Sequence, residues 1–265
     1  MFMDKFWIII ISFVIAVVYF VDYKMDKANA PDPDIIQSIQ HRGYLIVGVK
    51  TDTKPFGYIE NGKNVGFDID IAKYIAKDIL HDENKVKFVP VNTENRLYKL
   101  NLEQVDMVVA TMTITDERQH IVACSKPYFR AGQALLVPQG SQISGLANLY
   151  NKNVGVLYGS TAEKNIRLLM PSAYVLGYKT PTEAYSALQT GKILAILSDD
   201  TILRSYALTN PSVKILPKRY SKELYGIAVR KDSSSEDLLK LVNDDITNML
   251  NDGTLINLKR KWKLN

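Results

Sequence analysis

The sequence predicts an α/β protein with mostly parallel sheets covered by helices. Two observations predict this class. Short apolar runs typical of buried strands alternate with segments whose apolar residues recur at helical spacing, and no internal repeat or low-complexity tract interrupts the pattern. With 265 residues, 46% of them hydrophobic, the chain can bury the core of one large domain or of two small lobes. Ligand sites in such folds lie at the carboxyl ends of the strands.

The strands and the clearest helix can be placed along the chain in order. Apolar runs predict strands at residues 44–49, 86–91, 107–110, 134–137, 154–157 and 193–197. Between the first two runs, residues 67–80 predict a helix, because one stripe along this segment is apolar. That stripe consists of Ile69, Ala72, Ile75, Ala76 and Ile79.

The N-terminus differs from the rest of the chain. Residues 6–21 read FWIIIISFVIAVVYFV and carry no charge, which is typical of an export-signal core or a short membrane anchor. Either interpretation places the remainder outside the cytoplasm, in the periplasm or at the outer face of the membrane. Residues 28–30 resemble a signal-peptidase site, but Pro31 follows directly. We therefore expect a retained anchor, with a linker up to residue 33.

Composition excludes several classes of function. The net charge of +5 and the pI near 9.0 come from lysines that alternate with carboxylates without a dense basic block, so no nucleic-acid partner is expected. One cysteine and three scattered histidines support neither a disulfide framework nor a Cys/His metal site. No metal, cofactor or catalytic residue is predicted.

A stretch of hydroxyl residues follows the strand predicted to end at residue 110. Residues 111–118, TMTITDER, lead from Thr111 and Thr113 to Arg118. Arginine presents a planar set of donors that fits a carboxylate in bidentate fashion, and hydroxyl groups can complete such a site. A helix cap with a surface arginine is the competing interpretation.

Two further strand ends carry polar groups. In residues 155–163, GVLYGSTAE, Ser160 and Glu163 have the spacing of a capping box, and a helix start of this kind favours an anion or is simply a cap. A nucleotide-binding loop requires a lysine directly after the second glycine, and this segment has none there. Asp199 and Asp200 follow another strand. One can hold an ammonium group and the other can cap the next helix, or both can be caps.

Together these motifs resemble the amino-acid-binding family (family 3) of extracytoplasmic solute-binding proteins of ABC importers. The most specific match is Gly66-Phe67-Asp68-Ile69-Asp70-Ile71-Ala72, which is similar to the family signature at the start of a helix. Further matches follow in the family's order at residues 105–106, 111–118, 125–128, 154–161, 199 and 225–227, and at the C-terminal 262–264. The resemblance implies a two-lobed α/β fold of the type II periplasmic-binding kind, with the ligand between the lobes.

The resemblance also assigns roles to individual residues. It implies that Arg118 holds the α-carboxylate of a free amino acid and that Asp199 holds its α-ammonium. The other implied ligand contacts are the hydroxyl or backbone groups of Thr111, Thr113, Ser160 and Thr161, and an aromatic wall at Phe56.

The side-chain pocket is predicted to be cationic. Lys50 and the segment Asn92–Arg96, which contains Thr93 and Arg96, are similar to the branch that binds glutamate and aspartate. The site would hold three cations, Lys50, Arg96 and Arg118, and one carboxylate, Asp199. This set complements the two carboxylates and one ammonium group of glutamate or aspartate, whereas glutamine would leave one cation unpaired in a desolvated cleft. We therefore predict a non-enzymatic binder of an acidic amino acid that works as a monomer with a membrane permease.

The resemblance further implies two lobes that close about a hinge. The expected parts are residues 1–33 as signal or anchor, 34–132 plus 221–265 as lobe one, and 133–220 as lobe two. Three alternatives remain open: a prephenate or arogenate dehydratase on the same fold, a binder of glutamine or another polar amino acid, and a receptor's ligand-sensing domain. The dehydratase is disfavoured because no spare buried acid can be identified as a proton donor.

Overall fold

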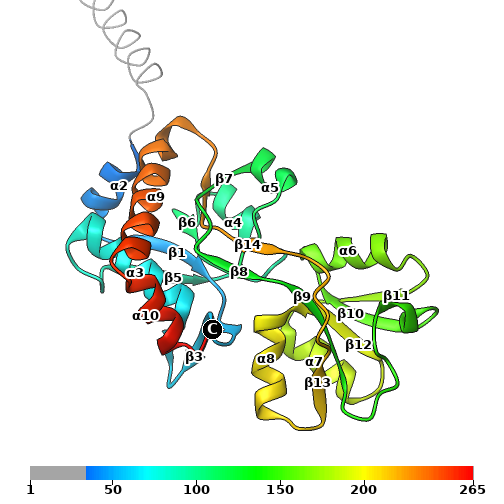
Figure 1. Ribbon diagram of the computed structural model, residues 1–265. Helices are drawn as coiled ribbons and strands as arrows, with labels where there is room; N and C mark the ends of the chain where they lie inside the picture. The colour runs from blue at the N-terminus through cyan, green and yellow to red at the C-terminus, as the bar shows by residue number, and fades with distance from the viewer. Residues whose placement is uncertain (1–33, 265) are drawn as a thin grey trace, which may run out of the picture. The chain divides into compact units, whose positions relative to one another are not determined.

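The computed structural model describes residues 34–264, which form one compact unit with two sheet-and-helix lobes (Figure 1). The predicted signal or anchor at residues 6–21 lies outside the described residues. Between residues 34 and 264, no helix combines the length and the apolar character needed to cross a membrane.

The first lobe contains a five-stranded sheet in the order β5-β1-β6-β15-β7. Strands β5, β1 and β6 are parallel, and β15 runs antiparallel to both of its neighbours. The strands are β1 (Leu45–Val49), β5 (Val86–Pro90), β6 (Met107–Val108), β7 (Val122–Cys124) and β15 (Ala228–Arg230). A small antiparallel sheet adjoins them, formed by β2 (Asp52–Thr53), β3 (Gly57–Glu60) and β4 (Lys63–Val65).

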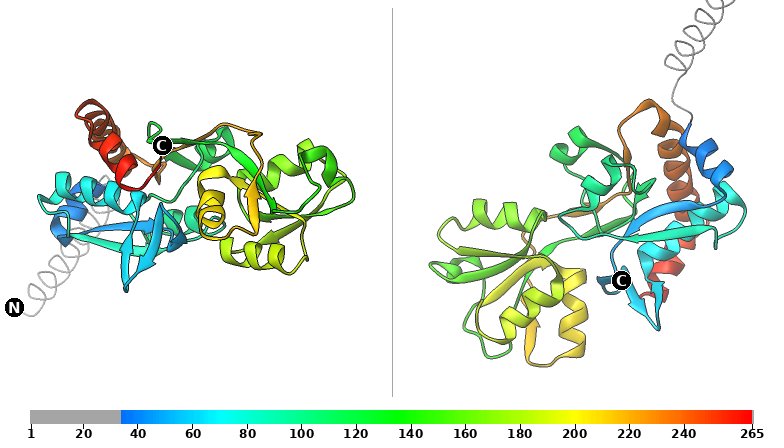
Figure 2. Two further views of the ribbon diagram at one scale, coloured as in Figure 1. Left: turned by 60° about the horizontal axis from the view of Figure 1, so that its bottom comes forward. Right: turned by 180° about the vertical axis from the view of Figure 1, so that it is seen from behind.

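Helices cover both faces of this sheet. One face packs against four helices that contact one another (Figures 1 and 2), and these are α2 (Ile35–Arg42), α3 (Phe67–Leu80), α9 (Glu236–Asn251) and α10 (Thr254–Lys261). On the other face a smaller cluster includes Leu100 of α4 (Arg96–Asn101). The short helix α5 (Asp116–Ile121) leads into β7, and η2 (Ser233–Ser235) precedes α9.

The second lobe repeats this layered arrangement. Its sheet has the order β11-β10-β12-β9-β13, in which only β9 runs against its neighbours. The strands are β9 (Gln133–Pro138), β10 (Asn153–Leu157), β11 (Tyr174–Tyr178), β12 (Ala195–Asp199) and β13 (Val213–Ile215). The helices are η1 (Leu146–Leu149), α6 (Thr161–Leu169), α7 (Pro181–Gln189) and α8 (Asp200–Thr209). The side chain of Ile166 in α6 joins one apolar cluster and that of Leu203 in α8 joins another.

Two antiparallel segments join the lobes (Figure 1). They are β8 (Phe129–Ala131) and β14 (Glu223–Tyr225), which pair with each other between the two larger sheets. In each sheet the reversed strand is the one that follows a crossing segment, β9 after β8 and β15 after β14. The prediction of mostly parallel sheets covered by helices is confirmed, and these crossings account for the exceptions.

The signature at residues 66–72 has a physical explanation in the fold. Gly66 has φ +136°, and an added Cβ would lie 2.0 Å from the carbonyl oxygen of Phe56, so only glycine fits. Asp68 is fully buried and accepts a hydrogen bond of 2.9 Å from the Tyr128 hydroxyl. Asp70 accepts a hydrogen bond of 2.7 Å from the indole nitrogen of Trp262, which ties the C-terminal segment to α3.

Candidate functional site

The predicted ligand residues converge at the carboxyl ends of strands from both lobes. Lys50 follows β1, Thr111 follows β6, Ser160 follows β10 and Asp199 ends β12. They line a small cavity of about 20 Å³ together with Thr93, Arg96, Thr113, Arg118, Leu157, Thr161, Ala162, Ser198 and Ile202. This volume holds about one water molecule. An adjoining, more open cavity of about 840 Å³ shares Thr93, Arg96, Thr113, Arg118, Ser160 and Thr161 with it and is also lined by Glu223.

Lys50 and Arg96 are cations with almost no contact with solvent, at 3% and 2% exposed. Burial, and after it the nearby charge of Arg96, lowers the pKa of Lys50 to about 8. Burial and the charge of Arg118 lower the pKa of Arg96 to about 9. The Nη1 atom of Arg96 donates to the carbonyl oxygens of Ala110 at 2.6 Å and Thr111 at 3.2 Å, whereas its buried Nε has no partner among residues 34–264.

Thr111 is held in a strained conformation three residues after the end of β6. Its φ is +45°, which is unfavourable for a β-branched residue. Its backbone N–H donates to Asp68 at 3.0 Å, and Tyr128 donates its hydroxyl to the same carboxylate at 2.9 Å. Burial raises the pKa of Asp68 to about 6. The buried hydroxyl of Thr111 lacks a hydrogen-bond partner within the described chain, so it is available to a ligand.

Arg118 is positioned by its own helix start. Thr115 caps α5 by accepting a hydrogen bond from the Arg118 N–H at 3.2 Å. The guanidinium donates to the carbonyl oxygen of Thr113 at 2.7 Å and, across the cleft, to that of Gly159 at 3.0 Å. Burial lowers the pKa of Arg118, and the negative charge of Glu223 opposes this effect. Both lobes therefore meet at this arginine.

The start of α6 brings the second lobe to the cleft. Ser160 is its N-cap and accepts from the Glu163 N–H at 3.1 Å, while its hydroxyl donates to the Leu157 carbonyl at 2.6 Å. The Glu163 carboxylate accepts from the Gly159 N–H at 3.0 Å. The capping role predicted for Ser160 is confirmed. Because its hydroxyl is engaged, Ser160 can offer a ligand mainly its backbone.

Gly159 allows the two lobes to approach each other. It has φ +69°, and an added Cβ would lie 3.1 Å from the carbonyl oxygen of Thr93. Thr93 itself lines the cavity. A second contact between the lobes is an exposed ion pair of 2.6 Å between Lys164 of α6 and Glu117 of α5.

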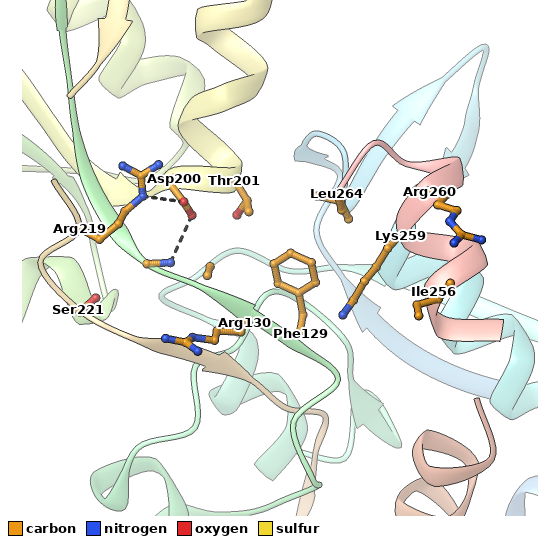
Figure 3. Close-up of a pocket in the computed structure, with 12 residues that line it drawn as sticks. Phe129, Arg130, Asp200, Thr201, Arg219, Ser221, Ile256, Lys259, Arg260 and Leu264 are labelled. Carbon is orange, nitrogen blue, oxygen red and sulfur yellow. Dashed lines mark hydrogen bonds and ion pairs between the residues drawn. The ribbon is translucent and has the colours of Figure 1, made fainter. Parts of the chain in front are cut away.

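The structure separates the roles of Asp199 and Asp200. Asp199 lines the cavity and accepts a hydrogen bond from the Tyr225 hydroxyl, and burial followed by the negative charge of Glu223 raises its pKa to about 6. Asp200 lines a different cavity, of about 550 Å³, where it accepts from Arg219 at 2.7 Å and from the Gly132 N–H at 3.2 Å (Figure 3). Asp199 occupies the N-cap position of α8 but makes no capping bond through its side chain. Neither side chain caps α8, so the predicted capping role is wrong, and Asp199 is the carboxylate that lines the small cavity.

Phe56 is not placed as the sequence predicted. It is fully buried, and its ring packs edge-on against Phe67 at 5.9 Å, Phe129 at 5.2 Å and Tyr225 at 5.6 Å. It does not line the cavity. The ring is buried because α3 and the crossing strands surround it with apolar side chains, and there it packs against Tyr225.

Sequence reasoning missed three residues that support the site: Asp68, Glu223 and Tyr225. Asp68 belongs to the recognised signature, and its acidic side chain in an otherwise apolar helix start was the available signal. Tyr225 lies in the matched segment 225–227. Glu223, only 2% exposed, had no such signal. Its partners Thr113 and Thr161 lie 110 and 62 residues away along the chain.

Comparison with known proteins identifies the family. Residues 45–265 match the family described as bacterial extracellular solute-binding proteins, family 3. The chain belongs to this family. Similar relatives in the family are the ABC transporter glutamine-binding protein GlnH of Bacillus subtilis and the glutamine-binding protein of Geobacillus stearothermophilus. The first is 41% identical, covering 86% of this chain and 84% of the relative, and the second is 42% identical, covering 76% and 78%.

Solved structures of solute-binding proteins share the two-lobed fold. An ancestral arginine-binding protein bound to glutamine superposes with a TM-score of 0.78 at 40% identity, covering 83% of this chain and 98% of that chain. The predicted type II two-lobed fold is therefore confirmed. Both relatives are named for glutamine, and the solved structure is an arginine-binding protein bound to glutamine. These ligands are properties of those proteins, so the ligand of this chain is argued from its own cavity.

Proposed function

We propose that this chain is the extracytoplasmic binding subunit of an ABC importer and that its ligand is an acidic amino acid, glutamate or aspartate. The observation that carries the proposal is the charge of the cavity lining. Three cations, Lys50, Arg96 and Arg118, face a single carboxylate, Asp199. Glutamate and aspartate carry two carboxylates and one ammonium group, which is the complementary set.

Each ligand charge has a candidate partner. Arg118 lies beside the cleft with guanidinium donors bound only to carbonyl oxygens, which a carboxylate can replace. Asp199 is placed for the α-ammonium. The Nε of Arg96 is unpaired within residues 34–264, and Lys50 lines the same cavity, so both can receive the side-chain carboxylate. Buried cations without partners are costly, and an anionic ligand would remove that cost.

Two buried carboxylates must be added to the charge balance predicted from sequence. Asp68 and Glu223 are also buried, so the whole site contains as many acids as cations. Both acids already accept hydrogen bonds from protein groups, and neither lines the small cavity. The lining of the small cavity therefore keeps its surplus of positive charge, whereas Glu223 lines the adjoining larger cavity.

Glutamine is the main alternative, because the two relatives above are named for it. A glutamine amide would offer Lys50 a neutral oxygen and would present an N–H₂ group toward a cationic pocket. That arrangement leaves the Lys50 ammonium facing a neutral group at the cavity surface, although Asp68 and Glu223 balance the charge of the site as a whole. A dehydratase would need an acid free to exchange a proton with its substrate. Asp199 is the one carboxyl group in the lining among the described residues, and the proposal assigns it to the ammonium.

The importer role requires a change of shape. We place lobe one at residues 34–132 plus 221–265 and lobe two at 133–220, with bending at the crossings near β8 and β14. Ligand would bind the open form through Arg118, and closure would add the α6 start and Asp199. A permease would recognise the closed monomer, and the segment at residues 6–21 would hold the binder at the outer face of the membrane. Ligand shifts the protein to the closed form only by binding it better than the open form.

A calorimetric screen of the full chain against the common amino acids tests the proposal. We expect glutamate or aspartate to bind at least about tenfold more tightly than glutamine, because the lost interaction is charge-assisted. Arg118→Ala should abolish binding of every amino acid, whereas Arg96→Ala should weaken acidic ligands selectively. A response to glutamine alone would refute the acidic ligand. Turnover of prephenate would refute the non-enzymatic role.

A further inference from the structure

The crossing strand β14 presents two polar side chains to the site. Glu223 and Tyr225 lie two residues apart in a strand, so they project from the same face. Both are buried, at 2% and 0% exposed. Tyr225 donates its hydroxyl to Asp199 of the second lobe. Glu223 has no role in the ligand contacts proposed above.

Glu223 collects three hydroxyl groups. Its Oε2 atom accepts from Thr113 of the first lobe at 2.6 Å and from Thr161 of the second lobe at 2.8 Å, and its Oε1 atom accepts from Ser221. Thr113 and Thr161 both line the small cavity. The carboxylate therefore lies next to two hydroxyl groups of the small cavity, and with them it lines the adjoining larger cavity.

This arrangement fixes the direction of each hydroxyl proton. A threonine hydroxyl has one proton to donate and two lone pairs to accept with. Because an ionised carboxylate only accepts, the protons of Thr113 and Thr161 point at Glu223. Thr161 also accepts from the Gln133 side chain at 2.9 Å, so most of its capacity is used. Thr113 keeps free lone pairs, and toward the cavity it can act only as an acceptor.

We propose that Glu223 is a positioning residue that orients the Thr113 hydroxyl as an acceptor for the ligand's α-ammonium group, beside Asp199. This proposal rests on the proposed function. An acceptor oxygen backed by a carboxylate suits an ammonium group and repels a carboxylate. It refines the general hydroxyl role assigned to Thr113 from sequence. It also accounts for a buried acid that the amino-acid-binding contacts leave unexplained.

The test compares an amino acid with its deaminated analogue. Glutamate and glutarate share both carboxylates and differ in the ammonium group, and calorimetry on the full chain measures both affinities. Glu223→Gln should weaken glutamate binding about 10- to 100-fold, the effect of one charge-assisted hydrogen bond, and change glutarate binding less than about threefold. If the screen identifies glutamine as the ligand, glutaramate is its deaminated analogue.

Two further variants separate positioning from general effects. Glu60→Gln removes an exposed carboxylate of β3 that lines neither cavity, and it should leave both affinities unchanged within about threefold. Thr113→Val removes the acceptor itself. The double variant Thr113→Val/Glu223→Gln should bind glutamate with the same affinity as whichever single variant has the lower affinity. The reason is that both substitutions act through the same hydroxyl oxygen of Thr113.

The outcomes distinguish this proposal from the proposed function. Equal weakening of glutamate and glutarate by Glu223→Gln would show that Glu223 only supports the fold or lobe closure, and would overturn the positioning role. Unchanged glutamate binding, or additive losses in the double variant, would also overturn it. A wild-type chain that binds no amino acid would overturn the proposed function first, and the positioning role with it.

Discussion

Replacing Lys50 with methionine should make the protein more stable and less able to bind an acidic ligand. Methionine has a similar length and no charge. Lys50 is 3% exposed, and burial lowers its pKa from 10.5 to about 8. That change corresponds to about 3 kcal/mol by which burial disfavours the charged form. Because part of this cost is relieved by relaxation, we expect Lys50→Met to raise the free energy of unfolding by about 1–3 kcal/mol.

The size of this effect depends on pH. Between pH 8 and 10.5 the unfolded chain binds the Lys50 proton more strongly than the folded chain does, so wild-type stability rises with pH across that window. The advantage of Lys50→Met should therefore be complete below pH 8 and vanish above about pH 10.5. At pH 7 it should appear as a rise in Tm of about 2–10 °C without ligand. Lys77→Met, at an exposed position on α3, is the matched control and should change stability by less than about 0.5 kcal/mol.

Binding should change in the opposite direction. Loss of the charge-assisted contact should weaken glutamate about 10- to 100-fold, while glutamine should lose less than about tenfold because its neutral amide forms a weaker bond. Thermal unfolding and calorimetry on the same samples provide both readings. A variant that loses stability and keeps its preference for glutamate over glutamine would refute the role given to Lys50.

Three further predictions concern pH, the helix signature and the core. Affinity for glutamate should be highest between about pH 6 and 8. Asp199, with a pKa of about 6, protonates below this window and Lys50, with a pKa of about 8, deprotonates above it. Calorimetry from pH 5 to 9 should show both limbs, and Lys50→Met should remove only the alkaline one. Gly66→Ala should prevent folding or cost several kcal/mol, because its Cβ would lie 2.0 Å from a carbonyl oxygen, whereas Gly43→Ala, with open space and φ +80°, should cost only about 1–2 kcal/mol in thermal unfolding. Phe56→Leu should cost about 1–3 kcal/mol of stability and leave glutamate affinity within about threefold, while a selective loss of affinity would return Phe56 to the ligand wall.

The local pattern of the sequence predicted the elements of the fold well. The helix expected at residues 67–80 is α3 at those bounds, because its apolar stripe and the preceding glycine are local signals. The strand expected at residues 193–197 is β12, which begins two residues later at Ala195. Ile193 is still buried, so its apolar character reflects core packing before the strand starts. Burial and strand pairing coincide only approximately.

The site could be predicted only in part, since hydrogen-bond direction depends on distant residues. The sequence located Ser160 and Thr113 as hydroxyl groups at strand ends, but not which atoms remain free. Ser160 uses its hydroxyl on its own helix, and Thr113 gives its proton to Glu223, which lies 110 residues away along the chain. Phe56 shows the same limit. The sequence predicted its position next to the site. The orientation of its ring depends on packing against Phe129 and Tyr225 of the crossing strands.

The cavity's cations also bear on how ligand and closure are coupled. Burial disfavours the charged forms of both Lys50 and Arg96, and the charge of Arg96 lowers the pKa of Lys50 further. Closing the lobes around them without an anion brings like charges out of water. An acidic ligand reverses this balance, because its second carboxylate compensates both cations in the closed form and far less in the open, solvated form. Glutamine supplies no such difference. Since a ligand shifts an equilibrium only by its differential affinity for the two forms, we infer that these cations make acidic amino acids better at closing the protein as well as at binding it.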